Sequence, residues 1–250
     1  MRVRGAMTAA VAGAALMMVA GCGDSDAGDE KPFAGKSADE IAADAVKATQ
    51  EADSMHMKGT VRQSGSSGAA VTVDLSVDQR KNCDGTISNG GASADVRHTN
   101  ATLYLRGDEK YWRNALKGQP GGGKVVPKVA DKWVKTPADD SMTQGLCDKQ
   151  GLVSSMDENK SERKGMKKGA TTTVNGTEAI RLTKKKAGGE TLTLYVATEG
   201  KPYILRTTST GGKEPSTATF SDYGKPVHPQ EPAAGETVDL KELAASAQKA

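Results

Sequence analysis

Hydrophobic and polar residues alternate with a period of two over most of this chain. The alternation is clearest at residues 71–77, and it recurs at 103–105, 180–182 and 192–196. This period predicts β-strands with one apolar and one wet face, as in antiparallel sheets that are covered on one side only. Further strands are predicted at 57–63, 85–88, 95–99, 110–113, 132–135, 171–174, 203–210 and 217–223. Hairpin turns are predicted at 107–109, 175–176 and 187–189, where glycines interrupt the pattern.

A helical period appears near the amino end. Ser37 and Glu40 have the spacing of a capping box, and small apolar residues then recur at helical intervals, which predicts a helix up to about Glu51. Because its apolar stripe is narrow, we expect this helix to lie against a sheet. A Gly/Pro loop is predicted at 117–129, a polar segment with weak helical character at 138–166, and a short terminal helix at 238–248.

The extreme amino end has the pattern of an export signal. Arg2 and Arg4 precede an apolar run from residue 7 to residue 20, and its 14 residues are fewer than a membrane-spanning helix needs but fit the core of a signal peptide. The run ends in VAGC, which resembles the lipobox of bacterial lipoprotein precursors. The resemblance implies cleavage before Cys22 and lipidation of its sulfur. The alternative is an ordinary signal peptide followed by a chance cysteine.

These features divide the chain into a signal peptide (1–21), an acidic flexible tether (22–36) and one folded domain (37–250). The composition, with 36% hydrophobic residues, describes a soluble body with a modest core. The formal charge is +3, and losing Arg2 and Arg4 leaves +1 on the mature chain. Charge therefore gives no reason to expect a nucleic acid as partner.

Once Cys22 is lipidated, Cys83 and Cys147 remain as a pair. In an exported chain, such a pair predicts a disulfide that pins the polar segment across the sheet. A metal site with two thiolates is the alternative, but no histidine lies at ligand spacing from either cysteine. We therefore expect no metal and no cofactor.

Other motifs give little support for chemistry. Residues 118–124 (GQPGGGK) match part of a phosphate-binding loop, but Val125 replaces the Ser or Thr that would hold Mg²⁺, so a flexible loop is favoured. His56, His98 and His228 are far apart in sequence, and no serine lies in a G-x-S-x-G elbow. We expect no enzyme. Two groups of lysines could touch anionic headgroups: Lys164, Lys167 and Lys168, and Lys184, Lys185 and Lys186. For the second group, a solvated hairpin tip is the favoured interpretation.

The apolar strand faces have two interpretations. Either they pack against the first helix, which is favoured for any single residue, or part of their surface stays open and accepts acyl chains. The candidate ligand-lining residues are Val71, Val73, Leu75, Leu103, Leu105, Leu192 and Leu194.

Two segments carry a resemblance to a known family. Residues 220–227 read FSDYGKPV and residues 102–112 read TLYLRGDEKYW. Together with the order of elements over residues 37–230, they resemble the actinobacterial lipoproteins of the LppX/LprG kind and the wider LolA/LolB-like superfamily. The resemblance implies a half-barrel of about eleven strands with helices on the concave side, and a role in carrying or sensing lipids. The polar helical segment and the aromatic content of 4% depart from that pattern.

The sequence thus predicts an α+β fold with a single strongly curved antiparallel sheet and helices packed on its concave face. The expected function is non-catalytic binding of a lipid or another hydrophobic envelope ligand. We expect the protein on the extracytoplasmic face of the cell membrane, which it reaches through lipidated Cys22. The alternative is an interaction or sensor-associated lipoprotein with a fully packed core and a protein partner in the envelope.

Overall fold

The fold was analysed in a computed structural model. It describes residues 33–62, 70–99, 102–137, 145, 147–158, 164–239 and 242–243, with side chains at 155–158 excepted. Contacts group Pro32–Ala250 into one compact unit. Ordered contacts begin at Phe33, four residues before the predicted domain start at Ser37, because residues 33–36 form a turn in which the Lys36 N–H donates to the Phe33 carbonyl.

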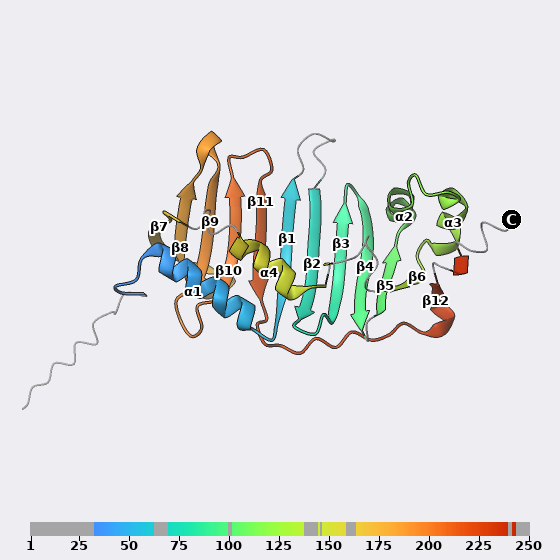
Figure 1. Cartoon of the computed structure of the whole chain (residues 1–250), viewed down its shortest axis with the longest axis horizontal. Coiled ribbons are helices and arrows are strands. Elements are labelled where there is room, and N and C mark those ends of the chain that lie inside the picture. Colours follow the sequence, from blue (N-terminus) through green and yellow to red (C-terminus); the bar gives the residue numbers. More distant parts are fainter. Residues whose placement is uncertain are drawn as a thin grey trace, which may run out of the picture. The chain divides into compact units, whose positions relative to one another are not determined.

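The described residues form one open sheet of twelve strands in the order β12-β6-β5-β4-β3-β2-β1-β11-β10-β9-β8-β7 (Figure 1). The single sheet predicted from the alternation is confirmed, but it is mixed, because β12 pairs with β6 in parallel. The strands are β1 (Ser54–Arg62), β2 (Ala70–Asp78), β3 (Cys83–Asn89), β4 (Ala92–Thr99), β5 (Thr102–Gly107), β6 (Trp133–Pro137), β7 (Lys167–Val174), β8 (Thr177–Lys185), β9 (Thr191–Ala197), β10 (Ile204–Thr210), β11 (Ser216–Ser221) and β12 (Thr237–Asp239).

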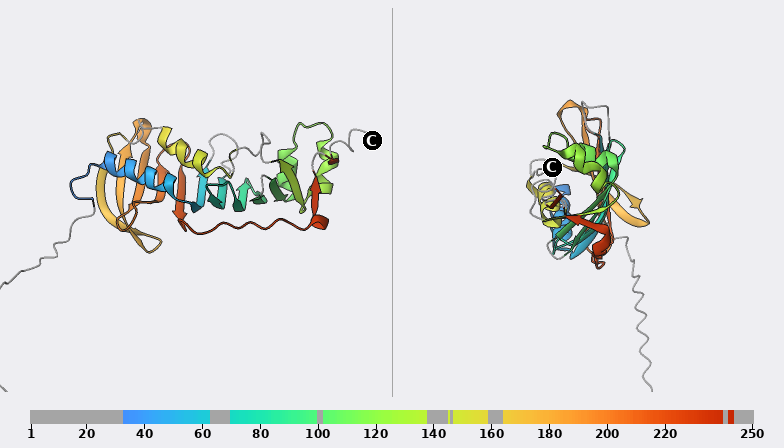
Figure 2. Two further views of the ribbon diagram at one scale, coloured as in Figure 1. Left: turned by 60° about the horizontal axis from the view of Figure 1, so that its bottom comes forward. Right: turned by 90° about the vertical axis from the view of Figure 1, so that its right-hand side faces the viewer.

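Helices α1 (Ala38–Glu51) and α4 (Lys149–Glu158) both lie over one face of this sheet (Figure 2). We call it the helix face; on β2 it carries Leu75 and Val77, which are buried with the apolar residues of α1 in the main core. The opposite, polar face carries Asp74 and Ser76 on the same strand. The predicted capping box of α1 is confirmed, since Ser37 and Glu40 cap each other reciprocally.

Two predictions about the segment after β5 are wrong. Residues 110–113 form no strand, and 107–109 form no hairpin turn, because Asp108 caps helix α2 (Glu109–Ala115) by accepting from the Tyr111 N–H. The predicted loop at 117–129 contains helix α3 (Gly122–Val129), which includes Pro127 and buries three valines: Val125, Val126 and Val129. This short helix tolerates proline because the ring removes only one hydrogen bond near its end.

The carboxyl end also differs from the prediction. Val238 and Asp239 of the predicted terminal helix belong to β12, while Glu242 and Leu243 are helical and the remaining residues of that segment lie outside the described part of the chain. The turns predicted at 175–176 and 187–189 are confirmed, between β7 and β8 and between β8 and β9. Asn175 and Gly176 have positive φ (49° and 84°), as a tight hairpin turn requires.

Candidate functional site

A groove of about 200 Å³ lies between α1 and strands β9–β11 on the helix face. We call it the α1–β9 groove. Its apolar lining consists of Val46, Met166, Leu192, Leu194 and Ile204, and its polar lining of Thr193, Thr207, Thr208, Ser209 and Ser216. Figure 1 shows α1 (blue) crossing the strands that form the floor. An apolar wall with a few hydroxyl groups is the composition of sites that hold amphiphiles.

A β-bulge in β10 determines which residues of this strand face the groove. The pairing of β10 with β9 shifts register between Ile204 and Arg206, so that Ile204 and Thr207 both face α1 although they are an odd number of residues apart. The N–H of Ile204 donates to Thr49 Oγ1 of α1 at 3.2 Å. Thr49 is fully buried, so this bond fixes the helix against the strand that carries the groove.

The polar end of the groove continues into an ion pair. Ser209 Oγ donates to Glu190 Oε1 at 2.7 Å, and Lys186 Nζ lies 3.5 Å from the same oxygen. The hydrogen bond from Ser209, aided by the charge of Lys186, lowers the pKa of Glu190. A carboxylate therefore stays ionised beside the hydroxyl row of Thr207, Ser209 and Ser216.

The seven predicted ligand-lining residues divide into three groups. Leu192 and Leu194 line the α1–β9 groove. Leu75, Leu103 and Leu105 are at most 3% exposed and belong to the packed core. Val73 packs against that core as a partly buried residue, and Val71 is half-buried. The sheet is thus filled at β2 and β5 and leaves space near β9.

Sequence reasoning missed Val46, Met166 and the hydroxyl side chains of the floor. Val46 could have been found from the helical period of α1. Ser216 and Thr207 are polar, so the hydrophobic pattern does not mark them as groove residues. The bulge in β10 also turns Thr207 to the face opposite the one that strict alternation from Ile204 predicts.

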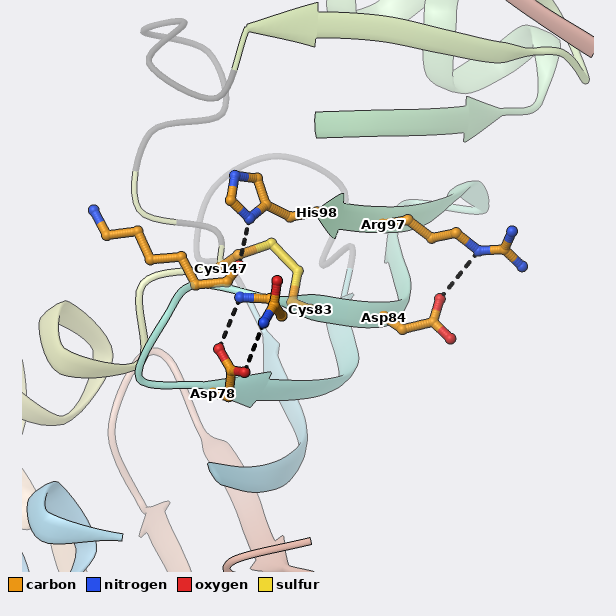
Figure 3. Close-up of a disulfide and its surroundings, with 8 residues drawn as sticks. Asp78, Cys83, Asp84, Arg97, His98 and Cys147 are labelled. Carbon is orange, nitrogen blue, oxygen red and sulfur yellow. Dashed lines mark hydrogen bonds and ion pairs between the residues drawn. A yellow bond between two sulfur atoms is a disulfide. The ribbon is translucent and has the colours of Figure 1, made fainter. Parts of the chain in front are cut away.

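The disulfide between Cys83 and Cys147 is present, with the two Cα atoms 5.6 Å apart (Figure 3). Cys83 is the first residue of β3, and Cys147 precedes α4 by two residues, so the bridge holds the start of α4 on the sheet, as predicted. Both cysteines are buried in the main core. The chain-entropy model gives such a 64-residue loop a stabilisation of about 4 kcal/mol.

Hydrogen bonds organise the turn that leads into Cys83 (Figure 3). Asp78, 6% exposed, accepts from the main-chain N–H groups of Arg80 and Asn82 at 2.8 Å. His98 Nδ1 donates to the Lys81 carbonyl, and Lys81 Nζ lies 3.5 Å from Asp148. These contacts hold the β2–β3 turn and the start of α4 together around the bridge.

The other histidines lie apart from the groove. His56 Nε2 binds Asp74 Oδ1 at 2.7 Å, and its Nδ1 lies 3.3 Å from Ser221 Oγ, on the polar face. Lys58 Nζ also contacts Asp74, and both contacts lower the pKa of this carboxyl, that from Lys58 the more. Ser221, His56 and Asp74 are the residue types of a catalytic triad. Acyl transfer also needs hydrogen-bond donors for an oxyanion. In the sheet, Ser221 lies directly opposite His56 on the neighbouring strand. His228 is exposed in the segment after β11.

Within the described ranges, no three His, Cys, Asp or Glu side chains come close enough to hold a metal ion. No described helix has the length and hydropathy to cross a bilayer. The partial phosphate-loop motif ends inside α3, at Lys124. Cys22 and the signal segment lie outside the described residues, as does most of the predicted tether.

No family model matches this sequence, and no curated protein matches it either. The fold is similar to that of LprF from Mycobacterium bovis, with a TM-score of 0.52 and 17% identity over 79% of this chain and 97% of LprF. The lipoprotein LppX of Mycobacterium tuberculosis matches at a TM-score of 0.45 and 15% identity, over 76% of this chain and 98% of LppX. The LolA superfamily protein NE2245 of Nitrosomonas europaea gives a TM-score of 0.25 at 8% identity, over 75% and 92% of the two chains. At these identities, the likeness to LprF establishes a shared fold.

Proposed function

We propose that this chain is a lipid-anchored extracytoplasmic protein that binds an apolar chain of a lipid, or of another hydrophobic envelope ligand, in the α1–β9 groove. The observation that carries the proposal is the groove itself, in which five apolar side chains from α1, the residue before β7 and the sheet surround unfilled space. The fold shared with LprF, and the lipoprotein name that LppX bears, support the proposal. The role is non-catalytic.

The volume of the groove indicates how much ligand it holds. About 200 Å³ lies below the ~300–1,000 Å³ of pockets for drug-sized ligands and only somewhat above the ~150 Å³ cavity that accepts benzene. One chain segment fits this space, and two do not. Because the hydroxyl row of Thr207, Ser209 and Ser216 lines the same groove, we expect an amphiphile whose polar oxygens bind there.

Ser216 and Thr217 allow a matched test, since these neighbours on β11 face opposite sides of the sheet. Ser216→Phe fills the floor of the groove, whereas Thr217→Phe adds the same ring to the exposed polar face. Organic extraction and mass spectrometry of the purified protein should find a stoichiometric amphiphile in the parent and in Thr217→Phe. Ser216→Phe should lose at least about nine-tenths of it, because the ring occupies the space that the ligand needs.

Equal lipid content in the two variants would place the ligand elsewhere. An absence of lipid from the parent, together with no binding of added single-chain amphiphiles, would contradict the proposal. That result would favour the interaction module with a packed core, since Leu75, Leu103 and Leu105 already show dense packing in the other half of the sheet.

The anchor has its own test at Cys22. Two acyl chains on this sulfur hold a protein on a membrane stably, because each buried methylene contributes about 0.8 kcal/mol. We expect Cys22→Ser to leave the chain unprocessed or to release it from the membrane, as measured by fractionation and intact mass. A processed Cys22→Ser protein that stays on the membrane would refute lipid anchoring.

A further inference from the structure

A second pocket lies at one end of the sheet, where three connecting segments meet. Neighbouring strands from β7 to β11 are antiparallel, so the carboxyl ends of β7, β9 and β11 lie at the same end, as Figure 1 shows for the β9–β10 loop and the end of β11. The pocket measures about 430 Å³, within the ~300–1,000 Å³ of small-ligand sites. We call it the loop-end pocket. Its described lining residues are all different from those of the α1–β9 groove.

Part of the lining of this pocket is apolar. Val174, Ala197 and Leu205 line it, and each is at most 8% exposed. They form a small core cluster of their own, on the polar face of the sheet, because their neighbours Val196 and Ile204 point into the main core on the helix face. A ligand that lies against this cluster therefore needs an apolar side of its own.

Two tyrosine rings also line the pocket. Tyr203 and Tyr223 are stacked, with ring centroids 4.0 Å apart and ring planes inclined by 6°. The Tyr223 hydroxyl donates to the Ile204 carbonyl, and the main chain of Tyr203 bonds to Lys201 and Ala197 at 2.7 and 2.9 Å. The rings are thus held in place by the fold. Aromatic rings add flat, apolar contact surface to a binding site.

Charged and amide groups come from all three segments. They are Asn175 in the β7–β8 turn, Glu199 and Lys201 in the β9–β10 loop, and Asp222 after β11. Lys225 Nζ lies 2.6 Å from Asp222 Oδ1, and this contact lowers the pKa of Asp222. A carboxylate only accepts hydrogen bonds, an ammonium group only donates them, and an amide does both. The ligand must therefore offer donors and acceptors side by side.

Ser221 adds a hydroxyl group whose orientation the polar face determines. His56 Nε2 donates to Asp74 Oδ1 at 2.7 Å, so the other ring nitrogen of neutral His56 has a free lone pair. This Nδ1 accepts from Ser221 Oγ at 3.3 Å. Because the hydroxyl hydrogen is engaged by His56, Ser221 Oγ offers its lone pairs to the pocket that it lines.

The charges of the lining balance one another. Lys225 pairs with Asp222, which leaves Glu199 and Lys201 as one negative and one positive group. This lining selects neither a cation nor an anion. Sugar hydroxyls both donate and accept, while the C–H groups of a sugar ring form apolar patches. A neutral saccharide therefore matches the mixed polar groups, the apolar cluster and the tyrosines together.

We propose that the loop-end pocket binds a neutral saccharide. An apolar side of the sugar lies against the tyrosines and the small core cluster, and its hydroxyls bind Asn175, Glu199, Lys201 and Ser221. The inference goes beyond the proposed function and depends neither on the anchor at Cys22 nor on the ligand of the α1–β9 groove.

The test uses the chain from residue 22 onward with Cys22→Ser, labelled with nitrogen-15. Amide spectra are recorded while maltose, cellobiose, trehalose, N,N′-diacetylchitobiose, spermidine or citrate is added. At least one disaccharide should shift the amide signals of Asn175, Glu199 and Ser221 in a saturable way, with a Kd of about 0.1–5 mM. Spermidine and citrate should not displace it.

Two matched pairs of variants locate the site. Thr177→Trp places a large ring in the pocket, whereas Thr173→Trp adds the same ring at an exposed position on the other face of the same hairpin. We expect Thr177→Trp to weaken binding at least about tenfold. Glu199→Gln should weaken it about threefold or more, because the charged acceptor is lost. Thr173→Trp and Glu236→Gln, a change at an exposed position near β12, should stay within about twofold of the parent.

Three results would overturn the proposal: no saturable shift with any of the four disaccharides, equal losses in both members of each pair, or displacement of the sugar by spermidine or citrate. The amide spectra also establish that each variant is folded. Glu199→Gln keeps the test decisive if Thr177→Trp disturbs the hairpin.

Discussion

Lys149 is the largest side chain with no exposed surface in the described part of the molecule. Its Nζ donates to the carbonyls of Thr49 and Gln50 at 2.9 Å each, at the carboxyl end of α1. Those carbonyls have no partner within the helix, so the lysine caps α1 from α4. Burial lowers the pKa of Lys149, and the nearby charge of Asp53 opposes this effect.

Lys149→Met keeps most of the volume but removes these hydrogen bonds. We expect it to lower the free energy of unfolding by about 1–3 kcal/mol, because the buried Thr49 carbonyl loses its donor, while the half-buried Gln50 carbonyl keeps only Gln150 Nε2. In the parent, the folded state holds the lysine proton less tightly than the unfolded state does. Its stability therefore gains from this group as pH rises from the lowered pKa toward about 10.4, and the variant lacks that gain.

Urea unfolding of parent and variant across this alkaline range measures both effects. Lys47→Met on the exposed side of α1 is the control and should change stability by less than about 0.5 kcal/mol. Equal stability of Lys149→Met and the parent would show that the cap contributes nothing.

Asp108 supports α2 in a similar way. Its carboxylate accepts from the N–H groups of Tyr111 at 2.6 Å and Ser93 at 2.8 Å. Burial acts to raise its pKa, but these hydrogen bonds outweigh burial and lower it. The contribution of Asp108 to stability is therefore complete above about pH 4 and is lost as pH falls through the lowered pKa.

We expect Asp108→Ala to cost about 1–2 kcal/mol at pH 7. The deficit should shrink as pH falls below about 4, where the carboxyl of the unfolded parent takes up a proton before that of the folded parent does. Thermal unfolding at pH 7 and pH 3 checks this. Glu109→Ala, which removes only an exposed pair with Arg113, should change little at either pH. A deficit that is independent of pH would mean that the carboxylate charge is irrelevant.

At the scale of elements, α4 is fastened at one end. Four consecutive residues, 147–150, connect it to β3 by the disulfide, to the β2–β3 turn by Asp148, and to the end of α1 by Lys149 and Gln150. Val153, one turn later, is fully buried in the core. A short helix of modest amphipathic character is thus positioned by its amino end.

Replacing both cysteines, Cys83→Ala with Cys147→Ala, should lower the free energy of unfolding by about 2–4 kcal/mol. The reduced parent should lose a similar amount, and reductant should not affect the double variant. Denaturant unfolding with and without reductant measures all four states. If the oxidised parent and the double variant unfold at the same denaturant concentration, the bridge does not stabilise the fold.

Most strands could be predicted from the alternation of side chains, because each strand buries one face only. The helices α2 and α3 could not, because the tyrosine and tryptophan of α2 favour strands and Pro127 disfavours a helix. Their formation depends on tertiary contacts. A Cβ on Gly107 would clash with the Tyr111 ring, and Trp112 is 3% exposed in the core. The predictions for residues 159–163 and for the amino end are not tested, since these residues lie outside the described part of the chain.

At the scale of the whole folded unit, the helix face has two differently filled parts. Over β3–β6, the side chains of α2 and α3 join the leucines of the strands in the packed core. On β10 and β11, the hydroxyl side chains of Thr207, Ser209 and Ser216 stand where leucines would fill the space, and the α1–β9 groove remains. The sequence predicted the shared apolar face but not this division, because an unfilled volume depends on the bulge in β10 and on where α1 lies.

The parallel pairing of β12 also determines how the sheet ends. After β11, residues 222–236 run past the ends of the central strands (Figures 1 and 2), bonded through Lys225 to Ser54 and through Gln230 to Arg97. They lead into the three residues of β12, which pair with β6 along the edge of the sheet. At the opposite margin, lysines and a bulge make β7 a poor template for another strand. Both margins of the open sheet therefore offer little free backbone to a second copy, which disfavours edge-to-edge pairing between molecules even where copies are crowded.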